Sequence, residues 1–298
     1  MDGHEVDAAE GEALTKDPRF VDRYGPWGLI AGASEGVGAA YARAIADRGL
    51  NVVLLARRQE VLDEVASGIR SASGVQTRTL AIDLSEPNAA ARVLAGTAGL
   101  EVGMFMYGAG ADPNYELFLD QPVADALRLV QRNCMTPLEL CHVFAASMVT
   151  RGKGGIVLVS SGAGFAGARN MVAYGASKAF DTVMGESLWA ELHEQGVNVL
   201  VTVLGATDTP AFRRTLTRRG LLPDPDDGAP IPGTATPEEV VTDVLANLTN
   251  GPTLLVGERV REGSKMLRAL TRSDAVRAMV AMSSGGIMET GSDEEATP

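Results

Sequence analysis

Seven short, continuously apolar runs, separated by longer segments of helical composition, constrain the fold of this chain most strongly. A run without polar alternation suits a strand that is buried on both faces, as in a parallel sheet covered by helices. Alternation of such strands with helices is typical of a doubly wound α/β domain. We therefore expect one Rossmann-type domain with strands at 29–31, 52–55, 79–82, 102–107, 156–159, 197–203 and 254–256.

Helical segments and polar chain ends complete this division. Helical composition occurs at 36–48, 59–70, 122–150 and 173–194. The two ends, 1–18 and 284–298, are acidic and lack apolar periodicity, so we expect flexible tails around a domain at 19–283. A Pro-rich connection at 207–235 interrupts the alternation. Long connections inside a compact domain are usually functional lids or disordered loops.

Charge and composition argue against several classes of protein. The net charge of −12 disfavours a nucleic-acid surface, which needs clustered Lys and Arg. No run approaches about 18 apolar residues and the start is acidic, so we expect no membrane span and a cytoplasmic location. Cys134 and Cys141, seven residues apart on one predicted helix, would lie about 10 Å apart, too far for a disulfide. The three histidines show no metal-ligand spacing, so no metal site is predicted.

Tyr174 and Lys178 point to acid–base chemistry. Four-residue spacing on a helix stacks two side chains on one face, and an ammonium beside a phenol favours the ionised phenolate. A tyrosine tuned in this way can move protons near neutral pH. Ser160 and Ser161 follow the apolar run at 156–159 and precede this pair.

A glycine-rich turn follows the first apolar run. Gly32, Gly36 and Gly38 lie in Ala-Gly-Ala-Ser-Glu-Gly-Val-Gly, directly before an alanine-rich helical segment. The glycines allow a tight bend, close backbone approach to a ligand and close helix packing, and the helix start attracts a pyrophosphate. An ordinary glycine-rich turn is the alternative, but the position between a strand and a helix favours dinucleotide binding.

Together these segments resemble the short-chain dehydrogenase/reductase family, whose marks are Thr-Gly-x-x-x-Gly-x-Gly, Asn-Asn-Ala-Gly, a helix asparagine, a strand-end serine and Tyr-x-x-x-Lys. The resemblance spans about residues 27–260. It implies seven parallel strands in the order 3-2-1-4-5-6-7, a nicotinamide cofactor, and interconversion of a ketone and a secondary alcohol. It also implies that 207–235 is a mobile lid over the substrate. The long helices at 122–150 and 173–194 would pair subunits into a homodimer or homotetramer.

The resemblance gives four polar residues a role in catalysis. Tyr174 donates the proton in reduction and accepts it in oxidation, while Lys178 favours its phenolate and holds the nicotinamide ribose. Ser161 hydrogen-bonds the substrate oxygen, and Asn133 orders a proton-relay water near the lysine. Each residue alone also fits a structural role, and their combination favours catalysis. Ser160 is expected to be structural.

The same resemblance identifies the residues that would hold the cofactor. Asp83 corresponds to an adenine-contacting aspartate at the end of the third strand, with a helix N-cap as the alternative. Thr209 corresponds to the residue that meets the nicotinamide carboxamide. The predicted set is Gly32, Ser34, Gly36, Val37, Arg57, Arg58, Asp83, Leu84, Gly108, Ala109, Tyr174, Lys178, Thr207 and Thr209.

The end of the second strand favours NADP(H) over NAD(H). Folds that bind NAD usually place a carboxylate there, whereas this chain has Arg57 and Arg58 after Ala56. A guanidinium matches the 2′-phosphate of NADP, and Arg57 is the expected ligand, with Arg58 stacked on the adenine or solvated. Glu35 argues for NAD(H), because NADP-using relatives often have a basic residue at that position.

Two departures from the family pattern leave other functions open. Ala31 replaces the threonine before the first glycine, and Tyr107 with Gly108 replaces the asparagine pair, so side chains that tie the central strands in relatives are lost. We expect altered packing rather than an inactive site, because no obvious polar partner is orphaned. Dehydration or epimerisation on the same fold, and a non-catalytic NADP-binding sensor, are the alternatives.

The predicted substrate is an apolar small molecule. Ligand pockets are mostly apolar with few polar groups, and four arginines between 213 and 219 fit either a phosphate-bearing thioester or a solvated helix. The sequence does not decide between a steroid, an acyl thioester, a sugar and a small ketone. The candidate pocket residues are Phe165, Met171, Phe212 and Leu216.

Overall fold

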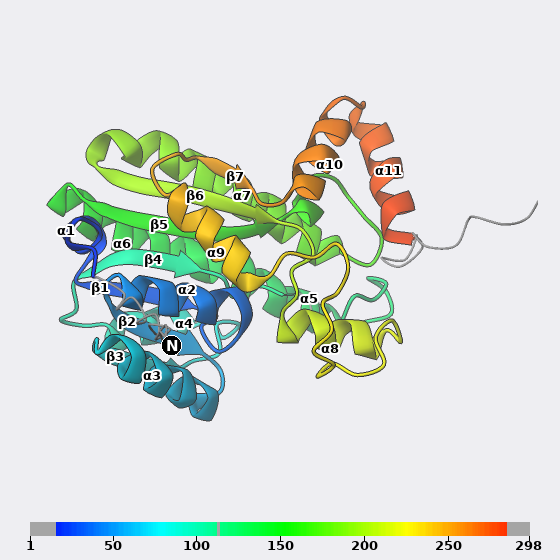
Figure 1. Ribbon diagram of the computed structural model, residues 1–298. Helices are drawn as coiled ribbons and strands as arrows, with labels where there is room; N and C mark the ends of the chain where they lie inside the picture. The colour runs from blue at the N-terminus through cyan, green and yellow to red at the C-terminus, as the bar shows by residue number, and fades with distance from the viewer. Residues whose placement is uncertain (1–15, 112–113, 285–298) are drawn as a thin grey trace, which may run out of the picture.

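A seven-stranded parallel sheet forms the centre of the computed structural model, which describes residues 16–111 and 114–284. The strand order is β3-β2-β1-β4-β5-β6-β7, so the predicted order is confirmed (Figure 1). Between β1 and β4 the order reverses, and ligands of such sheets bind at this switch point. The strands are β1 (Trp27–Ala31), β2 (Asn51–Ala56), β3 (Thr77–Ala81), β4 (Val102–Tyr107), β5 (Gly154–Ser161), β6 (Val197–Leu204) and β7 (Thr253–Leu255).

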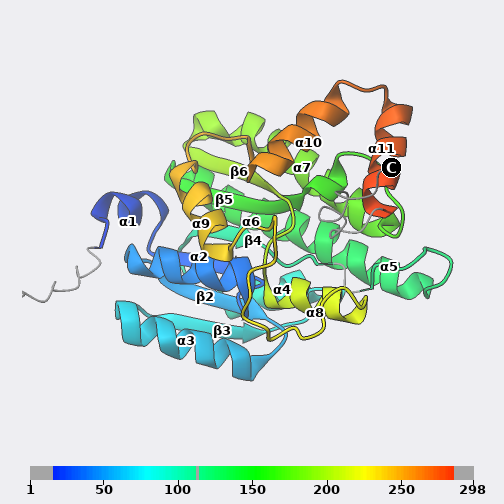
Figure 2. The same ribbon diagram turned by 45° about the vertical axis from the view of Figure 1, so that its right-hand side comes forward.

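Helices cover both faces of this sheet (Figures 1 and 2). One face packs against α1 (Pro18–Tyr24), α2 (Gly36–Asp47), α3 (Gln59–Ser73) and α9 (Pro237–Ala246). The other packs against α4 (Ala89–Gly96), α6 (Thr136–Arg151) and α7 (Val172–Leu192). Helix α5 (Val123–Val130) continues through a short π-helix, η1 (Gln131–Met135), into α6.

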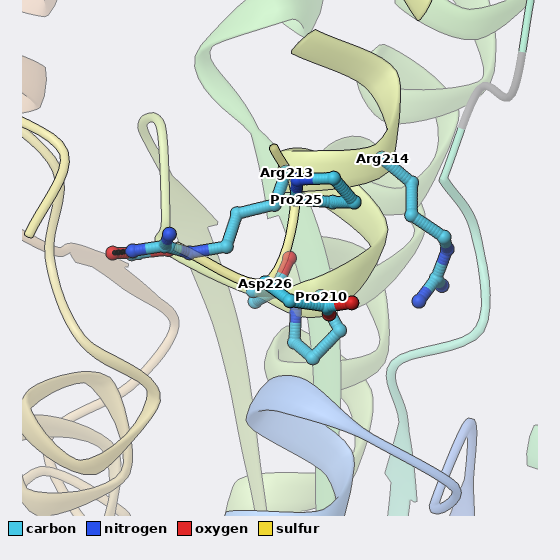
Figure 3. A pocket seen from close by; sticks show the side chains of 7 residues that line it. Pro210, Arg213, Arg214, Pro225 and Asp226 are labelled. Carbon is cyan, nitrogen blue, oxygen red and sulfur yellow. Dashed lines mark hydrogen bonds and ion pairs between the residues drawn. The ribbon is translucent and has the colours of Figure 1, made fainter. Parts of the chain in front are cut away.

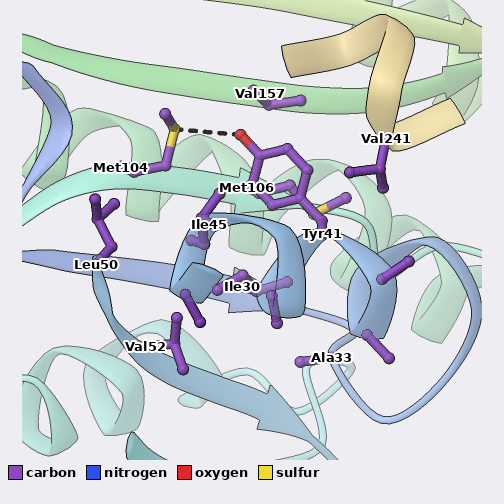
Figure 4. Close-up of a cluster of buried hydrophobic side chains, with 14 of the residues drawn as sticks. Ile30, Ala33, Tyr41, Ile45, Leu50, Val52, Met104, Met106, Val157 and Val241 are labelled. Atoms are coloured by element: carbon purple, nitrogen blue, oxygen red, sulfur yellow. Dashed lines mark hydrogen bonds between the residues drawn. The ribbon is translucent and has the colours of Figure 1, made fainter. Parts of the chain in front are cut away.

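Successive side chains of β1 show how the sheet is buried on both faces. Ile30 belongs to the core under α2 and α9, whereas Leu29 and Ala31 belong to the core under α6 and α7. Tyr41 of α2 is fully buried in the first core, and its hydroxyl contacts the Met104 sulfur at 3.4 Å (Figure 4). Strands buried in this way explain the absence of polar alternation in the sequence.

The last two helices stand at the end of the sheet to which the strand arrows point (Figures 1 and 2). They are α10 (Glu258–Arg268) and α11 (Arg272–Ser284). Leu267 and Met279 pack with Ala166, in the segment after β5, and Arg272 donates to the Phe165 carbonyl at 2.7 Å. The α10–α11 pair is therefore attached to the segment that follows the predicted catalytic serine.

The boundaries differ from those expected at several places. The third strand begins at Thr77, and α1 begins at Pro18, inside the range predicted as the N-terminal tail; the rest of the predicted tails lies almost wholly outside the described residues. Residues 207–235 contain a helix, α8 (Pro210–Arg218), and bury Leu216 and Ile231, which gives this segment more fixed structure than the sequence suggested. No helix within 16–111 or 114–284 is long and apolar enough to cross a membrane.

Candidate active site

The glycine turn lies at the switch point of the sheet, and its glycines let neighbouring segments approach its backbone closely. Gly32 has a φ of +93°, and a Cβ there would lie 2.9 Å from the Ala109 nitrogen in the turn after β4. Gly36 has a φ of +57°, and a Cβ there would lie 2.9 Å from Thr209 Cγ2. Helix α2 then begins without a side-chain cap, so its first N–H groups are open to an anion. The turn therefore fits a pyrophosphate.

Arginine side chains at the end of β2 differ in their partners. Arg57 is exposed and has no hydrogen bond or ion pair within the described part of the chain. Arg58 instead forms a 3.0 Å ion pair with Glu35, whose other oxygen pairs with Arg214 of α8. Glu35 thus holds two of the guanidinium groups nearest to the glycine turn.

Asp83, after β3, caps a turn rather than a helix. Its Oδ1 accepts hydrogen bonds from the nitrogen and hydroxyl of Ser85, and Oδ2 lies 3.4 Å from Arg128. Burial favours the protonated form, but the bonds from Ser85 and the nearby Arg57 and Arg128 outweigh it and lower the pKa of the Asp83 carboxyl. Helix α4 begins later, with Asn88 as its N-cap residue, so the alternative of a helix N-cap at Asp83 is wrong.

Ala31, Tyr107 and Gly108, which depart from the family pattern, leave no buried side-chain polar atom of the described residues without a hydrogen-bond partner around them. Tyr107 donates its hydroxyl to the Arg132 carbonyl in η1, and the Gly108 nitrogen donates to the Ala31 carbonyl at 2.9 Å. In the described residues, the buried side-chain oxygens or nitrogens without a partner belong to Asn170 and Thr202. The Tyr107 side chain thus links β4 to η1, while β4 remains paired with β1 through the backbone.

Asn133 lies in η1 and its carboxamide is fully engaged. Nδ2 donates to Ser177 Oγ at 2.9 Å and to the Gly110 carbonyl at 3.3 Å, and Oδ1 accepts from Arg132 Nε at 3.0 Å. These bonds join η1, α7 and the turn after β4. Short π-helices are frequent at functional sites.

The end of β5 brings the serine pair against α7. The Ser160 hydroxyl donates to the Lys178 carbonyl at 2.8 Å and lies 2.8 Å from Thr182 Oγ1, so it clamps the strand to the helix. Ser161 is half-buried, and its Oγ accepts from the Ala163 nitrogen at 3.2 Å. The following turn, η2 (Gly162–Gly164), packs against the first turns of α7, since a Cβ on Gly175 would lie 3.0 Å from the Ala163 carbonyl.

Lys178 is the most tightly held charged group of the site. Its Nζ lies 5.9 Å from the centre of the Tyr174 ring and donates to the Val159 carbonyl at 2.8 Å. Asp181 Oδ2 pairs with the same Nζ at 3.0 Å, and both side chains are about 5% exposed. A Cβ on Gly110 would lie 2.8 Å from Nζ, so the ammonium faces the turn after β4.

Tyr174 is the accessible phenol of this site. It is half-buried, whereas Tyr107 is 4% exposed, and burial raises the pKa of Tyr107 well above that of an ordinary phenol. A half-buried phenol beside an ammonium can give a proton to a substrate oxygen or take one from it.

The lid segment is fastened by Arg213. Its guanidinium bonds to both Asp208 oxygens, at 2.5 and 2.7 Å, and to the carbonyls of Asp227 and Ala229. The hydrogen bond from Arg213 lowers the pKa of the Asp208 carboxyl. Figure 3 shows Arg213 and Arg214 leaving α8 in opposite directions beside a cavity of about 250 Å³.

The remaining predicted residues occupy mixed positions. Thr209 caps α8 by accepting from the Phe212 nitrogen at 3.1 Å, and Thr207 is buried and bridges to Ala235. The Leu84 side chain lies in the core, and Ser34, Val37, Met171 and Phe212 are half-buried. Leu216, on α8 within 207–235, is 2% exposed, so its side chain is buried rather than open to a ligand.

Sequence reasoning missed Asp181 and the contact between Glu35 and Arg214. An acid three residues after Lys178 on a predicted helix was a readable signal for the first. The second joins residues 179 positions apart and had no local signal. Cys134 and Cys141 are buried free thiols, as expected, and the described ranges contain no His, Cys, Asp and Glu group suited to a metal.

Comparison with known proteins gives consistent matches. A family model described as short chain dehydrogenase matches residues 27–219. The 7beta-hydroxysteroid dehydrogenase of Collinsella aerofaciens is 34% identical over 242 residues, which cover 81% of this chain and 89% of the relative. A solved structure of a 7beta-hydroxysteroid dehydrogenase aligns with a TM-score of 0.79 and 33% identity, over 87% of this chain and 98% of the other. A short-chain dehydrogenase from Sphingobium yanoikuyae in complex with NADPH aligns with a TM-score of 0.67 and 28% identity, over 90% and 99%.

Proposed function

The chain belongs to the short-chain dehydrogenase family and interconverts ketones and secondary alcohols with a nicotinamide cofactor, and from this premise we propose that Tyr174 is its acid–base residue. The observation that carries the proposal is the convergence of four elements on Lys178. Its Nζ faces Gly110 after β4, bonds to Val159 in β5, and lies over Tyr174 on α7, while Asn133 in η1 shares the Gly110 contact.

The chain's own groups divide the work in this proposal. The bound nicotinamide supplies or accepts the hydride. During reduction, negative charge develops on the substrate oxygen, and Ser161 Oγ donates a hydrogen bond to it while the Tyr174 hydroxyl gives its proton. Lys178 stabilises the phenolate that remains. Both amide hydrogens of Asn133 are donated within the protein and its Oδ1 accepts from Arg132, so its proposed role in ordering a water falls to its main-chain carbonyl.

The glycine turn, the open start of α2 and the turn after β4 are the proposed cofactor site. Support for NADP(H) comes from Arg57, which follows β2 and has no hydrogen bond or ion pair within the described residues, and from the lack of a carboxylate at that strand end. A free guanidinium can bind a 2′-phosphate in a forked geometry. Glu35 opposes this preference because it lies beside Arg58.

A bulky apolar ketone is the proposed substrate, and ketosteroids are the first compounds to test. Similarity to 7beta-hydroxysteroid dehydrogenases over most of the chain supports this choice. A supporting feature of the structure is the α10–α11 pair, which adds an apolar wall beside the segment after Ser161. Acyl thioesters remain the second class in the test.

Turnover measured with NADPH and NADH on ketosteroids and 3-oxoacyl thioesters tests the whole proposal. Tyr174→Phe removes the acid and keeps the ring, so the rate should fall at least about a hundredfold while NADPH binding is nearly kept. Near-full activity of this variant would refute the role of Tyr174. Absence of turnover on every ketone, with NADPH still bound, would favour the sensor alternative.

We also propose a homodimer or homotetramer in the cytoplasm. Support for the oligomer comes from large apolar side chains that are exposed on the outer helices: Val123 and Leu127 of α5, Leu138 and Val143 of α6, and Val172 and Val183 of α7. Apolar surface of this kind often marks a protein interface. Sedimentation equilibrium should give two or four subunits, and a monomer at all concentrations would exclude this part of the proposal.

A further inference from the structure

A buried carboxylate faces the ammonium of the active site from the next turn of the same helix. Asp181 and Lys178 are 4% and 5% exposed, and Oδ2 lies 3.0 Å from Nζ. Burying two charges is costly unless they pair with good geometry, so a pair at this place requires an explanation. The family resemblance assigns nothing to position 181.

The hydrogen bonds of Nζ define where the ammonium can act. An ammonium has three donors, and two of them are taken by Asp181 and by the Val159 carbonyl. Nζ also faces Gly110, where a Cβ would lie 2.8 Å away. With two donors fixed, the third is left for a group placed between the turn after β4 and α7, which is where the proposed cofactor ribose would lie.

The other titratable groups around Asp181 do not share its charge. Burial, and to a smaller extent Asp181 itself, raises the pKa of Cys134 to about 11 and that of Cys141 to about 12. Burial also raises the pKa of Tyr107 and so keeps it neutral. Arg132 opposes this rise in pKa, and Asp181 adds to it. At neutral pH the thiols of η1 and α6 and the phenol of β4 are therefore uncharged. Lys178 and Asp181 form the charged pair whose contacts lie beside Tyr174, and Arg132 of η1 is a further charge in this region.

We propose that Asp181 is a positioning residue: it orients Lys178 so that one N–H faces the cofactor ribose, and its negative charge offsets part of the ammonium field at Tyr174. This inference rests on the proposed function of Lys178 and Tyr174. The separations of 5.9 Å and 3.0 Å place the carboxylate within about 9 Å of the phenol ring. Removing the negative charge of Asp181 favours the loss of a proton from Lys178 and from Tyr174, whichever of the two loses its proton first.

Titration of the full chain without substrate tests the electrostatic half of this proposal. Phenolate absorption of the wild type minus that of Tyr174→Phe isolates Tyr174, and the same difference is taken on the Asp181→Asn background. At an effective dielectric constant of about 20, a charge this far away should shift the midpoint by about one pH unit, downwards in Asp181→Asn. Asp181→Glu, which keeps the charge, should titrate like the wild type. A structural role for Asp181 would leave the midpoint in place.

Binding measurements test the positioning half. The ribose is common to both cofactors, so Asp181→Asn should weaken NADPH and NADH by the same factor, about two- to tenfold for one hydrogen bond. Because neither readout needs turnover, an enzyme inactive on every ketone would refute the proposed function and leave this inference standing. An unshifted midpoint with unchanged binding in folded Asp181→Asn would overturn it.

A folding defect does not remove the test. Asp181→Ser, which leaves room for a water beside Nζ, replaces Asp181→Asn if the latter does not fold, as judged by circular dichroism. If neither neutral variant folds while Asp181→Glu does, the carboxylate is required for folding, and the proposal is overturned.

Discussion

Glu35→Gln gives a sharp test of how the cofactor end of the site is charged. Glu35 is 23% exposed on its side chain and pairs with Arg58 and Arg214, which are 55% and 47% exposed. Both carboxylate oxygens are occupied in this way, one by each guanidinium. A 2′-phosphate bound by Arg57 is repelled by Glu35, and it must compete with Glu35 for any contact with these two neighbouring guanidinium groups.

The magnitude follows from the exposure of the two pairs. Exposed ion pairs contribute about 0.2–1 kcal/mol each, so two of them amount to about 0.4–2 kcal/mol. Glu35→Gln should therefore tighten NADPH binding by about two- to thirtyfold and leave NADH binding nearly unchanged. The difference should shrink as salt is added, because these groups are solvent-exposed.

Equilibrium titration of both cofactors against wild type and variant provides the assay. Glu64→Gln is the matched control, because it removes the same charge from an exposed position on α3. Unchanged NADPH affinity in Glu35→Gln would refute the competition between the carboxylate and the phosphate. Equal tightening of NADPH and NADH would show instead that the variant altered the glycine turn in general.

Three further outcomes are expected. Arg57→Ala should weaken NADPH about ten- to a hundredfold and spare NADH, and equal loss of both cofactors in titrations would exclude Arg57 as the phosphate ligand. Ser160→Ala should lower the free energy of unfolding, measured with denaturant, by about 1 kcal/mol and should keep activity. Ser161→Ala should keep stability and reduce the rate about a hundredfold or more. The reverse pattern would exchange the roles of the two serines. Protection factors for hydrogen exchange across 207–235, taken relative to the intrinsic exchange rate at each pH, should rise when cofactor and substrate bind. Without ligand they should fall only as the pH drops through the lowered pKa of Asp208, since the contact with Arg213 is complete above that range; equal protection factors under all conditions would show a static segment.

Local patterns predicted the parts of the fold and site that depend on short stretches of chain. Apolar runs identified the strands because a strand buried on both faces cannot alternate. The glycine turn could be found because its function requires glycine at fixed offsets from a strand and a helix. Tyr174 and Lys178 were recognisable because helix geometry sets their spacing.

Contacts between distant segments were beyond sequence reasoning. Arg58 and Arg57 are adjacent and alike in sequence, and the difference between them arises from Glu35 and its second partner on α8. Asp83 was correctly picked as a strand-end acid, but which groups it caps depends on where Ser85 and Arg128 lie. The arginine-rich stretch of α8 was anticipated only as a solvated helix; that this helix is fixed by packing, with Leu216 buried, depends on contacts outside the segment.

The position of the α10–α11 pair bears on how such an enzyme can diversify. The segment matched by the family model ends at residue 219, whereas these helices occupy 258–284 and contact the chain just after Ser161. A change in the length or composition of this helical hairpin can therefore reshape the surface beside the proposed substrate site while the residues proposed for proton transfer stay where they are. Substrate recognition can therefore change, through evolution or through exchange of this hairpin between relatives, without a change in the residues proposed for proton transfer.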